Sequence, residues 1–104
     1  MIKVTADAAK QIQIARSQSG ADGLSLRLAA EKQEDGSLHY MMGFDGTKDA
    51  DIQVVSEGVE ILVEPQYQEL LDGTTIDYVE LESGDFRFIF MNPNDANFQP
   101  GEKA

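Results

Sequence analysis

The sequence contains no cysteine and no tryptophan, and its 104 residues include only three prolines and eight cationic side chains. The absence of cysteine excludes disulfides, thiol redox chemistry, a cysteine nucleophile and thiolate metal ligands. No apolar run is long enough to cross a bilayer. The first five residues, MIKVT, have neither the apolar region nor the cleavage site of a secretory signal. We therefore expect a soluble, cytoplasmic protein that does not bind a membrane.

The charge balance is strongly acidic, with 19 acidic against eight basic side chains and a net charge of −11. The cations are scattered singly along the chain, so no basic cluster is present to bind the phosphates of a nucleic acid. A protein partner with a basic surface fits this charge better, because opposite potentials speed encounter. Solubility alone is the simpler explanation of the acidic excess.

The N-terminal part of the chain predicts a helix over residues 5–19. Thr5 is a suitable N-cap, and Asp7 lies in the first turn, where the helix dipole favours negative charge. Ala8, Ile12 and Ala15 recur at helical spacing and mark the face that we expect to be buried. The helix should end at Gly20.

Most of the remaining chain alternates between apolar and polar residues, which is typical of half-buried strands. Leu24, Leu26 and Leu28 begin a hairpin over residues 24–44, and its turn contains Asp35-Gly36, a pair in which both residues can take positive φ. Pro65 can open a short helix. The pattern predicts a β-rich α+β domain over residues 1–94 with six or seven short strands, followed by a flexible tail over 95–104. The further strands are expected at 52–55, 59–63, 76–81 and 86–90.

An ordered set of segments runs through nearly the whole predicted domain. It includes LDGTTIDYVE at residues 71–80, GDFRF at 84–88 and FMNPN at 90–94, with GLSLRL at 23–28 upstream. Together these segments resemble the A-type iron–sulfur carriers, the HesB-like family of IscA, SufA and ErpA. The resemblance implies a HesB-like fold and a carrier that is not an enzyme.

The family holds iron or a cluster with three cysteines, and the resemblance places these ligands at Asp35, Gln99 and Gly101. Iron–sulfur clusters need soft thiolates or imidazoles, whereas these positions offer a hard carboxylate, a neutral amide and no side chain. We therefore expect no cofactor, no metal site and no catalytic residue here. The family's docking surface can still be inherited, as in cysteine-less members that serve sulfur oxidation. It would bind a protein partner of sulfur oxidation or iron–sulfur metabolism, and without the cysteines of the shared tail site a monomer is favoured.

Two alternative interpretations concern the hairpin turn. Glu31, Glu34 and Asp35, with His39 nearby, could form a weak site for iron or another hard cation through carboxylate oxygens. The simpler interpretation is a solvated acidic turn beside a histidine that lacks the partners of a structural metal site.

The C-terminal half contains carboxylates and aromatic residues that could be mistaken for a site. Strand alternation places Asp77 on the opposite face from Glu80 and Glu82, and Asp72 and Asp85 flank turns, so no acid–base pair is expected. A nucleic-acid stacking platform would need a basic groove, and we therefore expect the aromatic side chains of the last strand to lie in the core, namely Phe86, Phe88 and Phe90.

Overall fold

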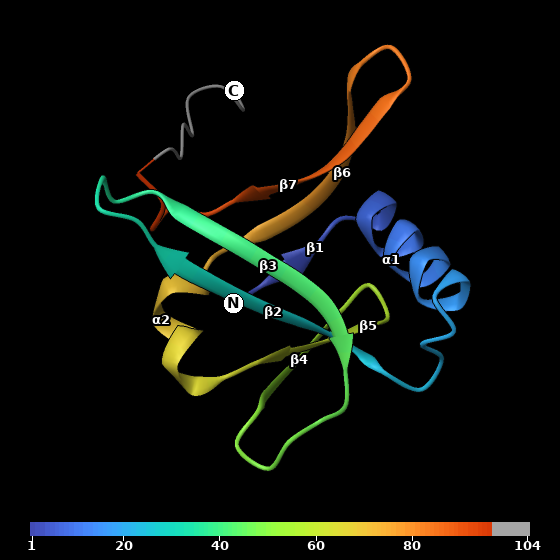
Figure 1. Ribbon diagram of the computed structural model, residues 1–104, viewed down its shortest axis with the longest axis horizontal. Coiled ribbons are helices and arrows are strands. Elements are labelled where there is room, and N and C mark those ends of the chain that lie inside the picture. Colours follow the sequence, from blue (N-terminus) through green and yellow to red (C-terminus); the bar gives the residue numbers. More distant parts are fainter. Residues whose placement is uncertain (97–104) are drawn as a thin grey trace.

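The computed structural model describes residues 1–96, which form two β-sheets and two helices (Figure 1). A three-stranded sheet has the order β1-β6-β7 and a four-stranded sheet the order β3-β2-β5-β4. The predicted α+β fold is confirmed, although the two-residue strand β1 was not predicted. The elements are β1 (Lys3–Val4), α1 (Ala6–Gln18), β2 (Ser25–Lys32), β3 (Leu38–Asp45), β4 (Ile52–Ser56), β5 (Val59–Val63), a 3-10 turn (Pro65–Tyr67), α2 (Gln68–Leu71), β6 (Thr75–Glu82) and β7 (Asp85–Met91).

The core lies between the two sheets and is closed on one side by α1. Alternating residues of β2 and β5 point inward, and Leu28 and Ile61 are fully buried among them. Ala8 and Ile12 supply the buried face of α1, as their spacing predicts. The helix begins at the predicted cap, where the Ala8 amide donates to Thr5 Oγ1 over 3.1 Å. The Thr5 hydroxyl in turn donates to the Asp77 carboxylate over 2.6 Å, which fixes the start of α1 against β6.

The turn between β2 and β3 differs from the predicted type. Gly36 has a φ of +87°, but Asp35 does not have a positive φ. The Gln33 amide donates to the Ser37 carbonyl and the Gly36 amide to the Gln33 carbonyl, so three residues form the loop, as in a type I turn followed by a left-handed glycine. The turn with two positive φ values is instead at Glu57-Gly58, between β4 and β5.

Two apolar side chains that were expected to be buried are exposed. Leu24 lies before the first residue of β2 and is 37% exposed. Phe86 is 52% exposed, because the β6–β7 hairpin extends beyond the sheets that cover the core (Figure 1). Phe88 and Phe90, nearer the centre of β7, pack against the core as predicted.

Candidate functional site

The carboxylate at the family's first ligand position is committed to its own turn. Asp35 Oδ1 accepts hydrogen bonds from the Ser37 amide at 2.9 Å and from the Ser37 hydroxyl at 2.6 Å. These two bonds, the hydroxyl first, hold the pKa of Asp35 below its usual value. The side chain that stands where a ligand is expected therefore stabilises the three-residue turn of the hairpin.

The chain returns to this turn after β7. The Ala96 amide donates to the Gly36 carbonyl over 3.2 Å. The Asp95 carboxylate accepts bonds from the Leu38 amide at 3.3 Å and from the Tyr40 hydroxyl at 2.9 Å. Burial, together with the Asp95 carboxylate, raises the pKa of Tyr40. The first two residues of the predicted tail are thus bound to the hairpin. Gln99, Gly101 and the rest of that tail lie outside the described residues.

The Asn-Pro-Asn segment directs this return. Asn92 is fully buried, and its Nδ2 donates to the Leu70 carbonyl at the end of α2 over 2.7 Å. Its Oδ1 accepts the Asn94 amide at 2.9 Å, while Asn94 Nδ2 donates to the Asp72 carbonyl at 2.9 Å. The two amide side chains therefore satisfy carbonyls that the short helix cannot pair internally. Sequence reasoning identified this segment by resemblance and as the end of the last strand, but no local signal places Asn92 beside α2, because 22 positions separate it from Leu70.

Only two of the side chains in the hard-cation hypothesis are cross-strand neighbours. Glu31 and His39 are opposite residues on β2 and β3, and both are exposed. Glu34 is exposed in the turn, and Asp35 already accepts hydrogen bonds from the Ser37 amide and hydroxyl. Among residues 1–96, no three histidine, aspartate or glutamate side chains are grouped so that they could hold a metal ion. The described residues offer only hard oxygen donors at the family position, and these do not fit an iron–sulfur cluster.

The C-terminal carboxylates have separate structural partners. Asp72 pairs with the amino terminus of Met1, which lowers its pKa, and Asp77 accepts the Thr5 hydroxyl. Glu80 accepts the Gly84 amide over 2.7 Å. Glu82 lies opposite Asp85 at the end of the β6–β7 hairpin, and Asp85 pairs with Arg87 at 3.3 Å.

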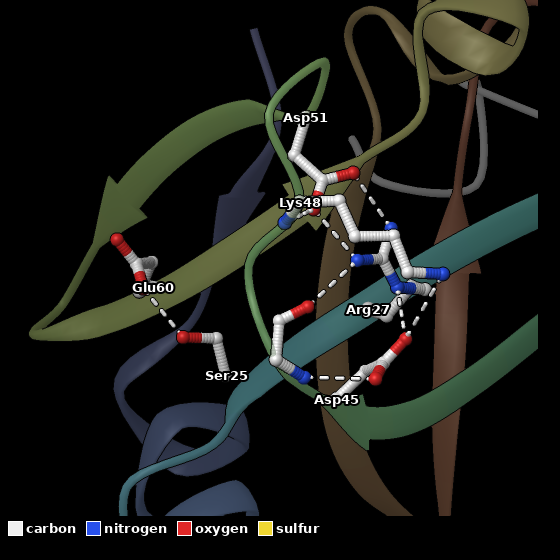
Figure 2. A network of polar contacts seen from close by, with 7 residues as sticks. Ser25, Arg27, Asp45, Lys48, Asp51 and Glu60 are labelled. Atoms are coloured by element: carbon white, nitrogen blue, oxygen red, sulfur yellow. Dashed lines mark hydrogen bonds and ion pairs between the residues drawn. The ribbon is translucent and has the colours of Figure 1, made fainter.

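A partly buried ion-pair cluster on the outer face of the four-stranded sheet was missed (Figure 2). Arg27 donates to both carboxylate oxygens of Asp51, at 2.8 and 2.6 Å, and to Asp45 Oδ2 at 2.7 Å. The side chain of Asp51 is only 2% exposed and that of Arg27 13%. The hydrogen bonds from Arg27 lower the pKa of Asp51 to about 2.

This cluster is a clamp and not a binding site. All three guanidinium nitrogens of Arg27 already have partners, including the Gly46 carbonyl at 3.1 Å. Asp51 also accepts the Lys48 amide at 2.7 Å, so the loop between β3 and β4 is fastened to β2 (Figure 2). Asp45 ends β3 and Asp51 precedes β4, 18 and 24 positions from Arg27, so no local sequence pattern pairs these side chains.

The fold and the hairpin site define a small carrier-type domain whose C-terminal segment docks on the β2–β3 turn. The chain belongs to the iron–sulphur cluster biosynthesis family, whose model matches residues 1–97. It is 34% identical over 94 residues to the iron–sulfur cluster insertion protein ErpA 2 of Methylococcus capsulatus, covering 89% of this chain and 72% of that protein. It is 36% identical over 95 residues to an uncharacterised protein in the nifU 5′ region of Cereibacter sphaeroides, covering 90% and 89%.

The fold resembles that of a crystal structure of IscA with the [2Fe-2S] cluster, at a TM-score of 0.72 and 26% identity, over 92% of this chain and 86% of that one. The crystal structure of Escherichia coli SufA has the same TM-score at 24% identity, over 89% of this chain and 86% of that one. This second likeness supports the fold alone. The family is one of carriers and not of enzymes, as the sequence predicts. Within the described residues, no helix is long and apolar enough to cross a membrane.

Proposed function

We propose that this protein is a non-catalytic member of the family that binds no iron–sulfur cluster and acts as a protein-binding or regulatory module. Its setting is sulfur oxidation or iron–sulfur metabolism in the cytoplasm. Among cysteine-less members it resembles DsrR of the dissimilatory sulfur-oxidation system. The observation that carries the proposal is Asp35, a hard carboxylate at the family's ligand position that is bound to Ser37 within its own turn.

The remaining ligand positions support the same conclusion. Gln99 offers a neutral amide and Gly101 no side chain, and neither replaces a thiolate toward iron. The hairpin and the segment that docks on it are held by hydrogen bonds among Gly36, Leu38, Asp95 and Ala96. These bonds need no metal, so the scaffold can serve a partner without carrying a cluster.

The partner is a protein with a basic surface. The net charge of −11 repels nucleic acid and anionic membranes, and it attracts basic patches through long-range steering. The same charge opposes self-association, which favours a monomer.

The proposal is tested by anaerobic reconstitution with iron and sulfide, followed by measurement of metal and acid-labile sulfide. The natural sequence should stay colourless and metal-free. The matched variant carries Asp35→Cys, Gln99→Cys and Gly101→Cys, and it should acquire iron and the visible absorption of a cluster. This gain would show that the missing thiolates, and not the scaffold, determine the result.

Three outcomes would count against the proposal. Stoichiometric iron in the natural protein that is lost on Asp35→Ala would favour the carboxylate carrier of hard cations instead. Iron bound to the natural protein and unaffected by Asp35→Ala would place a metal site elsewhere and end the argument from the family position. Absence of any specific partner in repeated pull-downs from native lysate would contradict the protein-binding role.

A further inference from the structure

A groove lies between α1 and the β6–β7 hairpin. These two elements are on the opposite side of the molecule from the tip of the β2–β3 turn (Figure 1). Its volume is about 300 Å³. The α1 residues in it recur at spacings of three, four and seven positions, so they share one face of the helix. The lining residues are Asp7, Lys10, Gln11, Ile14, Tyr78 and Phe86.

The two walls of the groove are apolar and exposed. Phe86 is 52% exposed on β7, and Ile14 is 39% exposed on α1. The Phe86 ring stacks on Tyr78, with centroids 5.7 Å apart and 19° between the ring planes. Phe88 contacts the same tyrosine at 4.8 Å and continues this row toward the core. The aromatic wall is therefore held in place, and an apolar side chain placed between it and Ile14 would lose its contact with water on both sides.

Acidic groups outnumber cations beside this apolar centre. Glu80 lies directly opposite Phe86 across the hairpin and therefore shares its face. Asp7 on α1 is a second carboxylate of the groove, and Lys10 is its one cation. Asp85 and Arg87 are the chain neighbours of Phe86, so they lie on the other face of β7, where they pair at 3.3 Å. The groove side of the described residues thus has a net charge of 1 − 2 = −1 on a chain whose total is −11.

We propose that this groove binds a basic segment of a partner protein, which inserts one aromatic or aliphatic side chain between Phe86 and Ile14. Lysines or arginines on either side of this anchor would face the carboxylates of Asp7 and Glu80. Complementary charge selects this occupant over a second copy of the chain, since two copies would each bring a net charge of −11. The inference rests on the proposed protein-binding function and gives it a location and a partner chemistry.

The probe is the peptide acetyl-KRKFKRK-amide, titrated into the full-length isotope-labelled protein and followed by amide chemical shifts. Shifts should concentrate at Ile14, Tyr78 and Phe86. Replacing the central phenylalanine of the peptide with serine should weaken binding by at least about tenfold, since burial of such a side chain exceeds that free energy. The peptide EDEFEDE should not bind.

The protein variants distinguish binding in the groove from a general attraction of the basic peptide to the acidic surface. Phe86→Ser should weaken binding of the KRKFKRK peptide about tenfold, and Ile14→Ser should act in the same direction. Val55→Ser is the matched control, because Val55 is a 68% exposed apolar residue on β4, in the other sheet. Lys10→Glu should strengthen binding and Glu80→Lys should weaken it, because Lys10 lines the groove and Glu80 lies opposite Phe86. Phe86 is exposed, and the dispersion of the amide spectrum reports whether each variant is folded.

Three outcomes would contradict the proposal that the partner binds in this groove. Equal affinities of the phenylalanine and serine peptides, with shifts spread over all acidic surfaces, would mean charge attraction alone. Equal effects of Phe86→Ser and Val55→Ser would place the anchor elsewhere. A native partner that binds the Phe86→Ser protein as well as the natural one would refute the groove while leaving the protein-binding function standing.

Discussion

Replacement of Asn92 by alanine should destabilise the protein far more than the same change at Asn94. Asn92 is fully buried and makes two hydrogen bonds, one to the Leu70 carbonyl and one from the Asn94 amide. Its removal leaves both backbone groups without that partner, and each unsatisfied buried group costs about 1–3 kcal/mol. The Leu70 carbonyl keeps a second donor, Asn94 Nδ2, at 3.3 Å. We therefore expect a total loss of about 2–4 kcal/mol.

The control uses the neighbouring asparagine of the same motif. Asn94 donates to the carbonyls of Glu69, Leu70 and Asp72, but it is exposed, so water can replace it. Asn94→Ala should cost less than about 1 kcal/mol.

Urea unfolding followed by circular dichroism measures both variants. With an m-value of about 1–2 kcal/mol/M for a chain of this size, Asn92→Ala should lower the midpoint by at least about 1 M and Asn94→Ala by less. Equal midpoints for the two variants, or a change for Asn92→Ala below about 0.5 kcal/mol, would refute the role assigned to the buried amide.

Two further predictions concern the cap of α1 and the clamp on the outer sheet face. Thr5→Ala removes the acceptor of the Ala8 amide and the donor to Asp77, and thermal unfolding should show a loss of about 1–2 kcal/mol; an unchanged melting temperature would contradict this. The pKa of Asp51 is about 2 in the folded state against 3.8 ordinarily, so its contribution is full above pH 4 and lost as the pH falls from about 4 to 2. The urea midpoint should fall through that window, and Asp51→Asn should reduce this fall; an identical acid profile in the variant would exclude Asp51 as its source.

The local elements could be predicted because their signals are periodic and lie within one segment. Thr5 and the spacing of Ala8 and Ile12 defined α1, and the alternation of Leu26 and Leu28 defined the buried face of β2. Strand β1 has only two residues and pairs with β6, about seventy positions away. A strand of that length has no period to detect, so its existence depended on tertiary contacts.

The errors at single residues have the same kind of cause. Alternation placed Phe86 on the inward face of β7 correctly, but it could not show that the hairpin extends past the core. The Asp35-Gly36 pair fits both a two-residue turn, with positive φ at both residues, and a three-residue loop, with positive φ at the glycine alone. The structure has the three-residue loop, in which Asp35 has a negative φ and accepts the Ser37 hydroxyl.

The candidate site was predictable in position but not in contacts. Resemblance placed Asp35 at the turn, because the strands on both sides of it match the family without a gap. The approach of Ala96 to Gly36 and of Asp95 to Tyr40 joins residues more than fifty positions apart. No local pattern reports such pairs, which is also why the clamp between Arg27 and Asp51 was missed.

The contacts that bring the C-terminal segment to the turn explain how a carrier fold can persist without its ligands. In domains that fold around a metal, the binding free energy of the metal is part of the folding free energy, and chelators unfold them. Here the return of the chain depends on Asn92, on the Asp95–Tyr40 bond and on the Ala96–Gly36 bond, all made by protein groups. The turn itself is closed by Asp35 and Ser37. The absence of thiolates therefore removes the ligands of a cluster without removing the hydrogen bonds that build the turn.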